Sequence, residues 1–378
     1  MKLKKNSKYN YKIILEITRI LKKKKYLDIQ YFPSNFSLLS VVKEHENIIN
    51  IFKKKKHLIF YFSLFPWFYR LFLNEEQKKS LDFFYYNRSI KYENLIEIIP
   101  KNIIIASIKN NIISKKNSYY SSNISLVPYK KLIFLRDSFK IYQDRFDPMK
   151  SGDFVWMGGD SVMFLRFLEN YLKKKSFKRI IEIGSGSGIV IISLSNKSKN
   201  CEAIDYNRRA VDYTSLNTKI NAIKNLKSYY SNIFNKVRGK FDLIIANPWF
   251  VDIKKGGLEE APYIIKKLDK HLEKKGFLLM LLNSYVKKNK DTAYLYLKKL
   301  AFKNNFDISI FVNGYSIERD RLEEYKKYNV NYYVSYSVVI KKDGLGILTK
   351  YEATMFRKFR DFLFIKTYKI LNFYKFWI

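Results

Sequence analysis

The residues with the clearest chemical potential form a glycine-rich loop, Glu182-Ile183-Gly184-Ser185-Gly186-Ser187-Gly188. An apolar run precedes the loop and a helical pattern follows it, so the chain turns sharply there. Glycines let a ligand approach the backbone, and the first amide groups of the next helix are free to bind it. Glu182 would repel a phosphate and suits a cationic amine or a sulfonium. The GxGxG spacing also disfavours a dinucleotide phosphate site. The structural alternative is a tight turn.

A second acidic residue, Asp205, ends the next apolar segment, Cys201–Asp205. A carboxylate at the end of the second strand of a nucleotide-binding α/β fold can accept hydrogen bonds from both ribose hydroxyls. The alternative role of Asp205 is to cap the helix that follows. Together with Glu182 and the glycine loop, Asp205 favours a nucleoside ligand.

A third motif, Asn247-Pro248-Trp249-Phe250, closes the apolar run Phe241–Ala246. Ligands of α/β folds bind at the carboxyl ends of parallel strands, so this motif is expected beside the nucleoside. Two alternatives stay open. Asn-Pro after a strand can be a simple turn, and the two aromatic residues can be ordinary wall packing.

In these features the sequence resembles the Rossmann-like, S-adenosylmethionine-dependent amino-methyltransferases, whose motif is Asn/Asp-Pro-Pro-Phe/Tyr. The resemblance covers about residues 150–342 and includes EIGSGSG, AIDYN (203–207), SNIF (231–234) and NPWF. It is greatest with the small-domain members, which are release-factor glutamine methyltransferases and ribosomal RNA guanine methyltransferases. Two positions depart from the family pattern: Trp249 replaces the second proline, and Asn232 replaces a frequent aspartate.

The resemblance implies S-adenosylmethionine as the cofactor and no metal. Asn232 would accept a hydrogen bond from the adenine amino group through its side-chain oxygen. Tyr206 and Ile233 would line the adenine slot, although either could belong to the core. A Gly-Gly turn before Asp160 could place that carboxylate near the methionine end or simply cap a helix. The expected cofactor-binding residues are Glu182, Gly184, Ser185, Gly186, Gly188, Asp205, Tyr206, Asn232, Ile233 and Asn247.

The expected catalytic residues are Asn247, Pro248, Trp249 and Phe250. The lone pair of an amide or exocyclic amino nitrogen is delocalised and must be aimed. The Asn247 side-chain oxygen and the Pro248 carbonyl can accept its N–H groups, which orients the lone pair and stabilises the developing positive charge. Phe250 and Trp249 can stack on the flat group. No strong general base is needed, because the methylated nitrogen loses its proton to water.

The function expected from this resemblance is N-methylation of a macromolecule, first of an exocyclic amino nitrogen of RNA. The second candidate acceptor is a glutamine side chain of a translation release factor or a ribosomal protein. Two other interpretations stay open. One is a methyltransferase-like module that binds nucleic acid without catalysis, and the other is a nicotinamide-dependent dehydrogenase.

The elements that must position these motifs follow an alternating order from about residue 150 onward. Strands are expected at 179–183, 201–205, 228–232, 241–246, 276–282, 306–312 and 331–340, and helices at about 160–174, 208–221, 259–274 and 291–303. Strands that alternate with such helices predict βαβ units and a mainly parallel sheet. The expected fold class is therefore α/β, with a Rossmann-like seven-stranded methyltransferase sheet.

The length of 378 residues favours more than one domain. Helical periodicity in the first 115 residues, followed by strand patterns, predicts a mainly helical substrate-recognition region over residues 1–150. The methyltransferase domain is expected over residues 151–342. A basic, aromatic and helical tail is expected over residues 343–378.

The charge balance points to polyanionic partners. Lys and Arg total 72 against 34 Asp and Glu, a formal net charge of +38. Codon bias in an AT-rich genome is the alternative source of many lysines. Basic breaks in residues 1–115 and in the tail alternate with Tyr and Phe, which offers phosphate contacts beside stacking surfaces. RNA or a ribosome-associated substrate is the expected partner, with a release factor as a further candidate.

Cysteine and apolar patterning indicate a cytoplasmic protein without a membrane partner. The single cysteine, Cys201, excludes a disulfide scaffold and a cysteine-based zinc cluster. The longest apolar segment, His57–Leu73, is short, contains Arg70 and is interrupted by Pro66, so it is expected in a core. The basic N-terminus is not followed by the apolar region of a secretory signal.

Overall fold

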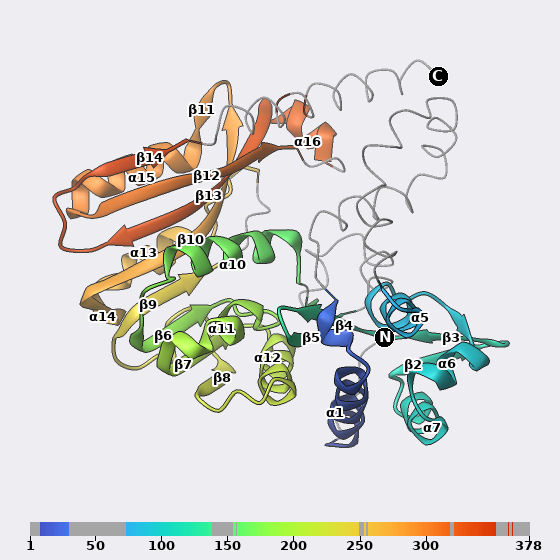
Figure 1. Cartoon of the computed structure of the whole chain (residues 1–378). Coiled ribbons are helices and arrows are strands. Elements are labelled where there is room, and N and C mark those ends of the chain that lie inside the picture. The colour runs from blue at the N-terminus through green and yellow to red at the C-terminus, as the bar shows by residue number, and fades with distance from the viewer. Residues whose placement is uncertain are drawn as a thin grey trace, which may run out of the picture. The chain divides into compact units, whose positions relative to one another are not determined.

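The computed structural model describes residues 8–29, 73–137, 154–155, 157–248, 253–254, 256–317, 321–352, 362 and 365 (Figure 1). Trp249, Phe250 and residues 57–72 of the longest apolar segment lie outside the described residues. The chain divides into two compact units. The first, called the helical unit, comprises residues 1–165, 186–193 and 207–228, and the second, called the sheet unit, comprises 166–185, 194–206 and 229–378. The domain boundaries at residues 150 and 342 stay a prediction.

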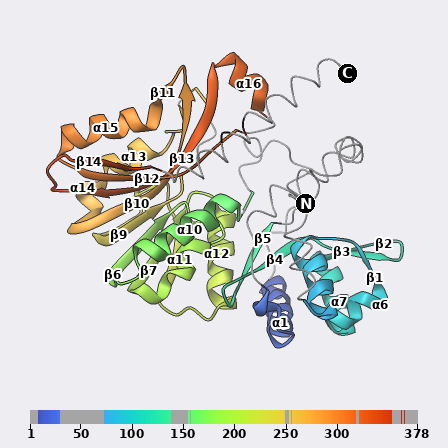
Figure 2. The ribbon, with the colours of Figure 1, turned by 45° about the horizontal axis from the view of Figure 1, so that its top comes forward.

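A nine-stranded sheet runs through the second half of the chain, in the order β14-β12-β13-β10-β9-β6-β7-β8, with β11 paired to β10 (Figures 1 and 2). β7, β6, β9 and β10 are parallel, whereas β13 is antiparallel to both β10 and β12. The strands are β6 (Phe177–Ile183), β7 (Ser198–Asp205), β8 (Leu226–Tyr230), β9 (Phe241–Ala246), β10 (Leu272–Lys287), β11 (Lys290–Asp291), β12 (Asp307–Ser316), β13 (Val330–Lys341) and β14 (Leu348–Tyr351).

The central strands form because their residues are buried on both faces. Ile180–Ile183, Leu243–Ala246 and Phe277–Tyr285 are all buried. Such continuous runs are typical of strands that are covered by helices on each side. The helices are α10 (Gly159–Tyr171), α11 (Ile189–Ser193), α12 (Arg208–Ile220), α13 (Ala261–Lys266), α14 (Leu268–His271), α15 (Thr292–Asn304) and α16 (Leu322–Lys327).

Helix α15 shows how the sequence sets an element's ends. The Asp291 side chain accepts a hydrogen bond from the Tyr294 backbone N–H at 2.9 Å and so caps the first turn. Asn305 ends the helix in the left-handed conformation, with φ of 52°. Leu297 and Ala301 pack into the core cluster of the sheet unit. The helix expected at 259–274 instead divides into α13 and α14, and α14 ends at His271 because Leu272 already pairs with Phe241 as part of β10.

The predicted α/β class with a mainly parallel sheet is confirmed. Seven strands, β8-β7-β6-β9-β10-β13-β12, form the expected Rossmann-like sheet, and β11 and β14 extend it. The expectation of a helical tail is wrong at residues 348–351, which form β14 in parallel with β12. Tyr351 stacks on Phe311 there, with 4.5 Å between ring centroids, which favours the strand.

The helical unit joins helices to two small antiparallel sheets, β1-β3-β2 and β4-β5. In α1 the residues Ile14, Ile17 and Leu21 are buried, as the helical spacing predicts. The Asn217 side chain of α12 accepts from the Leu135 N–H at 2.7 Å and donates to the Leu135 carbonyl at 3.0 Å. The bounds of the other elements of the helical unit are α1 (Lys8–Lys23), α5 (Glu75–Ser80), α6 (Tyr92–Ile98), α7 (Lys101–Lys109), β1 (Ile90–Lys91), β2 (Ile113–Lys116), β3 (Tyr119–Ser122), β4 (Ile124–Tyr129) and β5 (Leu132–Asp137).

In the part of the chain that the structure describes, no helix has the length and apolar character needed to cross a membrane.

Candidate active site

The glycine loop leaves β6 and enters α11 with three residues in the left-handed region. The φ angles of Gly184, Gly186 and Gly188 are 71°, 55° and 76°. The backbone N–H groups of Gly184 and Ser185 both donate to the Ile204 carbonyl, at 2.9 and 3.0 Å. These bonds tie the start of the loop to the end of β7. The loop therefore has a defined path and is more than a simple reversal of the chain.

Two of these glycines are required for different reasons. A Cβ built on Gly184 would meet no atom within 4 Å, so open space lies beside this residue. A Cβ on Gly188 would lie 2.9 Å from the Thr214 Cγ2 atom and 3.1 Å from the Ile192 Cδ1 atom. Gly188 thus permits close packing inside the helical unit, whereas Gly184 keeps a space open at the sheet's edge.

Asp205 and Asn247 come from the two strands that flank β6. Ile183 pairs with Ile204 on β7 and with Ala246 on β9, so the next row contains Asp205, Gly184 and Asn247. Residues of one row in parallel strands point to the same face of the sheet. The strand ends thus bring together a carboxylate, an open backbone position and a carboxamide.

Glu182 lies two residues before Gly184 and on the same face. Its neighbours in register are Ala203 and Ile245, and the residue is only 2% exposed. Asp205 is 7% exposed. Two nearly buried carboxylates at one edge of the sheet produce a negative potential, which favours a cationic ligand and repels phosphate.

The capping role considered for Asp205 is filled by another residue. The Asn207 side chain accepts a hydrogen bond from the Arg209 N–H at 2.9 Å and is the N-cap of α12. Asp205 ends β7, where its backbone carbonyl accepts from the Ser231 N–H at 3.1 Å. The Asp205 carboxylate is therefore not needed as the cap of this helix.

Tyr206 lies just beyond Asp205 and is 59% exposed. Partial burial raises the pKa of the Tyr206 phenol, and the nearby carboxylates of Glu260 and Asp205 raise it further. A large aromatic side chain that is this exposed can form one wall of a ligand site. This exposure does not agree with a core residue, and the place of Tyr206 in the adenine slot stays a prediction.

The Ser231–Ile233 turn carries a signal that sequence patterning missed. Ile233 has φ of 47°, and a β-branched residue in this region is a genuine outlier. The buried Ser231 hydroxyl holds the turn, since it donates to the Ile233 carbonyl at 2.8 Å and accepts from the Lys236 N–H at 3.1 Å. Asn232 is left exposed at the tip and Ile233 is half-buried. Backbone strain of this kind is typical of functional sites, and no periodicity of the sequence reveals it.

Gly257, nine residues beyond Pro248, packs closely on β10. Asn247 is half-buried and Pro248 is buried. Gly257 lies against the Asn283 carbonyl so tightly that a side chain would overlap it. The Asn283 Oδ1 atom is buried and has no hydrogen-bond partner among the described residues. Asn283 lies three residues beyond Met280, which pairs with Ala246, and so reaches the level of the motif. Sequence analysis missed this polar residue, because it stands within an apolar run.

Asp160 occupies the first turn of α10, which begins at Gly159. An acidic residue there interacts favourably with the helix dipole. This position explains a structural role for Asp160, and a role near the methionine end of the cofactor stays a prediction.

Comparison with known proteins identifies related chains. The family model for the methyltransferase small domain matches residues 158–308. A putative protein N5-glutamine methyltransferase of Methanocaldococcus jannaschii is 31% identical over 161 residues, which cover 38% of this chain and 78% of that protein.

Two further relatives match over shorter shares of their length. A release factor glutamine methyltransferase of Buchnera aphidicola is 27% identical over 156 residues, which cover 35% of this chain and 55% of the relative. A ribosomal RNA small subunit methyltransferase C of Klebsiella pneumoniae is 29% identical over 128 residues, which cover 33% and 36%. The chain thus spans about half of the first relative and about a third of the second.

Proposed function

The chain belongs to the methyltransferase small-domain family, and from this membership we propose that it transfers a methyl group from S-adenosylmethionine to a nitrogen atom of a macromolecule. The observation that carries the proposal is the row of Asp205, Gly184 and Asn247 above the buried Glu182. This row combines groups that suit a charged nucleoside with a carboxamide that suits an acceptor nitrogen.

The residues present fit this cofactor. Gly184 leaves open space beside the backbone, and the carboxylates of Glu182 and Asp205 stand on the same face. In the proposed site Glu182 interacts with the cationic methionine end and Asp205 accepts the ribose hydroxyls. Asn232, Ile233 and Tyr206 line the adenine. When bound, the cofactor supplies a methyl group activated by its attachment to a sulfonium.

Asn247 and Pro248 act on the acceptor in this proposal. The Asn247 side-chain oxygen and the Pro248 carbonyl accept N–H bonds from the acceptor nitrogen and aim its lone pair. They also stabilise the positive charge that develops on this nitrogen. The nitrogen then releases a proton to water, so no general base is required. The proposed stacking by Trp249 and Phe250 rests on the sequence motif alone.

The favoured acceptor is an exocyclic amino nitrogen of RNA, because the net charge of +38 attracts polyanions. A relative of this chain is named as a ribosomal RNA methyltransferase. The second candidate is a glutamine side chain of a release factor or ribosomal protein, which the names of two other relatives favour. Both acceptors present a planar nitrogen, so the same row of residues can serve either.

Calorimetric titration tests the cofactor assignment. S-adenosylhomocysteine should bind, and NAD should give no heat of binding. The opposite result would assign the fold to a nicotinamide-dependent enzyme and end the proposal. The acceptor is then identified by mass spectrometry of ribosomal RNA, transfer RNA and release factors from cells with and without the gene.

A further inference from the structure

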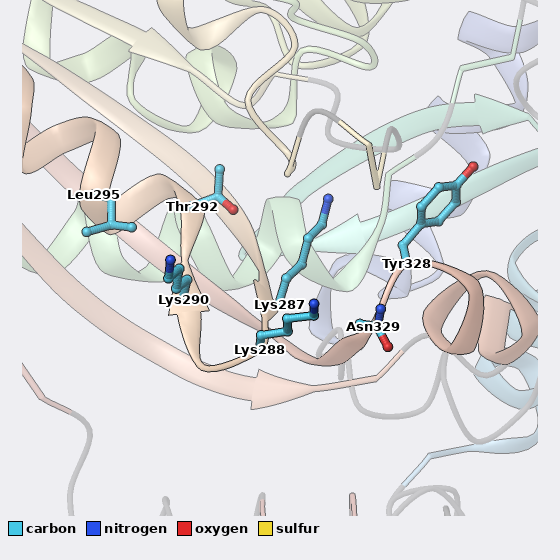
Figure 3. A pocket seen from close by; sticks show the side chains of 7 residues that line it. All are labelled: Lys287, Lys288, Lys290, Thr292, Leu295, Tyr328 and Asn329. Atoms are coloured by element: carbon cyan, nitrogen blue, oxygen red, sulfur yellow. The ribbon is translucent and has the colours of Figure 1, made fainter.

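A basic pocket opens at the tip of the β10–β11 hairpin, within the sheet unit. Its volume is about 460 Å³. Figure 3 shows Lys287 and Lys288 between Thr292 and Tyr328, and Lys290 below Thr292 on the side of Leu295. The residues that line it are Lys287, Lys288, Lys290, Thr292, Leu295, Tyr328 and Asn329. They come from the hairpin, the start of α15 and the turn before β13.

The hairpin places its lysines where local structure disfavours them. Lys287 and Lys290 face each other directly across the two strands, and like charges in such a pair are destabilising. Lys288 and Asn289 form the two-residue loop with φ of 46° and 63°. Such loops favour Asn, Asp or Gly, so Lys288 is an unfavourable choice at the first position. Because local structure disfavours all three lysines at this tip, we expect a bound ligand to offset the free-energy cost of placing them there.

The charged residues that line the pocket are all lysines, and the carboxylate of the neighbouring Asp291 is bonded to the Tyr294 N–H and to the hydroxyls of Ser284 and Tyr336. No acidic residue is among the described residues that line the pocket. Two further ammonium groups approach the Tyr328 ring, with Lys254 at 6.0 Å and Lys327 at 5.6 Å from its centroid. A bound anion would relieve the mutual repulsion of the lysines.

Two described residues that follow the Asn247 motif in the chain, Lys254 and Gly256, lie beside the pocket. The Lys287 ammonium donates to the Lys254 carbonyl at 3.3 Å. Gly256 lies against Thr292, since a Cβ there would be 2.5 Å from the Thr292 Cγ2 atom. Lys254 and Gly256, which follow the motif in the chain, therefore border the pocket.

The register gives the separation between the pocket and the proposed reaction centre. Ala246 pairs with Met280, so Asn247 is level with Leu281, and Lys287 stands six residues further along β10. At about 3.3 Å per residue this is roughly 20 Å. A ligand that reaches both points must be extended and anionic at one end.

We propose that this pocket binds the sugar–phosphate backbone of an RNA acceptor whose methylated nucleotide lies at Asn247. Lys287, Lys288 and Lys290 contact phosphates, and a base stacks on Tyr328. This inference rests on the proposed function, because it extends the acceptor site of that enzyme to a second contact. Repeated phosphates about one nucleotide apart match a pocket with several lysines better than a single small anion does.

The test uses full-length protein with the pocket variant Lys287→Thr/Lys288→Gly/Lys290→Thr. The matched control is Lys270→Thr/Lys274→Thr/Lys275→Thr, which removes the same charge from exposed sites before and at the start of β10. The probe is a fluorescent single-stranded RNA of mixed sequence and about 20 nucleotides, titrated by anisotropy between about 50 and 200 mM KCl.

The pocket variant should bind this RNA about tenfold more weakly, and its log–log salt slope should be shallower by about 2, since each lost phosphate contact removes about 0.7. The control should keep the slope of the native protein. Equal salt slopes for the pocket variant and the control variant would contradict the proposal that RNA binds in this pocket. Glycine at position 288 suits the left-handed backbone, so the pocket variant should melt no lower than the native protein, and weaker RNA binding is then not due to unfolding.

Further measurements distinguish RNA from the other possible ligands of the pocket. Tyr328→Leu should weaken binding of the RNA and leave binding of poly-glutamate of similar length unchanged. If the lysine changes weaken poly-glutamate as much as RNA and Tyr328→Leu affects neither, an acidic protein is the ligand and the RNA proposal is wrong. If millimolar inorganic phosphate displaces the RNA completely at constant ionic strength, the pocket is a free-phosphate site and the proposal is also wrong.

Binding of S-adenosylhomocysteine is measured on every variant. Its absence from the native protein contradicts the proposed enzyme, whereas its presence with an inert pocket contradicts only this inference.

Discussion

Asp205 and Asn247 stand in one row on opposite sides of Gly184, because Ile183 pairs with Ile204 on β7 and with Ala246 on β9. One of the two offers a carboxylate and the other a carboxamide, from strands that are not neighbours in the sheet. The proposed roles therefore separate: Asp205 serves the cofactor and Asn247 the acceptor. Substitutions at the two positions should have different consequences.

Replacing Asp205 by Ala should weaken S-adenosylhomocysteine binding by about tenfold to a hundredfold. One hydrogen bond to a charged group contributes about 1.5–3 kcal/mol, which is this tenfold to hundredfold loss, and the loss of the second bond to the ribose would add to it. Asp212→Ala, which removes an exposed carboxylate from α12, is the control and should leave the affinity unchanged. Calorimetry gives both values. An Asp205→Ala protein with native affinity would exclude Asp205 from the site.

Replacing Asn247 by Ala should lower the rate of methyl transfer by about 10²–10³, the usual effect of removing one oriented group that stabilises a transition state. Cofactor affinity should change little. Asn247→Asp keeps an acceptor oxygen and should retain more activity than the Ala variant. Single-turnover transfer to the identified acceptor measures these rates. Near-native turnover in the Ala variant would mean that Asn247-Pro248 is only a structural turn. No turnover in the native protein would indicate a module that binds without catalysis.

Alanine at Gly184 and at Gly188 should separate binding from folding. Both positions are left-handed, where an L-residue costs roughly 1–2 kcal/mol. At Gly184 the added methyl group enters open space, so cofactor affinity should fall. At Gly188 it also meets the Thr214 Cγ2 atom, so the thermal midpoint should fall further. Thr214→Ser removes that methyl group, keeps the hydroxyl that donates to Gly186, and should partly restore the Gly188→Ala protein. Equal midpoints for the two single variants would contradict this packing.

His271 should make the stability of the protein depend on pH. Burial lowers the pKa of His271 below its ordinary value of 6.5, and Lys267 and Lys270 lower it further, while the Gly239 carbonyl opposes the shift. The ring stacks on Phe234, with 4.3 Å between centroids. The unfolded chain then binds more protons below about pH 6.5 than the folded chain, so stability is present above that pH and decreases as the pH falls. His271→Phe should lose this part of the pH dependence in urea titrations between about pH 5 and 7.5. An unchanged slope would mean that His271 does not couple to folding.

The central strands could be predicted from the sequence because they depend on local rules, and so could the positions of the glycine loop, Asp205 and Asn247 at the carboxyl ends of these strands. Continuous apolar runs specify parallel strands, and the groups at their ends then share an edge. What sequence analysis missed depends on contacts that are distant in sequence or on the backbone alone. The left-handed Ile233, the strand β14 and the facing of Lys287 and Lys290 depend on turn geometry and pairing register. The letters Lys-Lys-Asn-Lys at 287–290 do include an Asn suited to such a hairpin loop, and that was the available signal.

Strand β14 has a consequence for the solubility of shortened chains. It pairs with β12 in parallel, and the turn before it is fixed by the Asp307 carboxylate, which accepts bonds from the N–H groups of Leu345 and Ile347 at 2.9 and 3.1 Å. Removing residues from 345 onward would expose the backbone edge of β12, a strand that alternates buried Ile308, Ile310 and Val312. Such an uncovered edge recruits strands from other molecules. β14 thus covers the edge of β12 against self-association, and truncation there should increase aggregation.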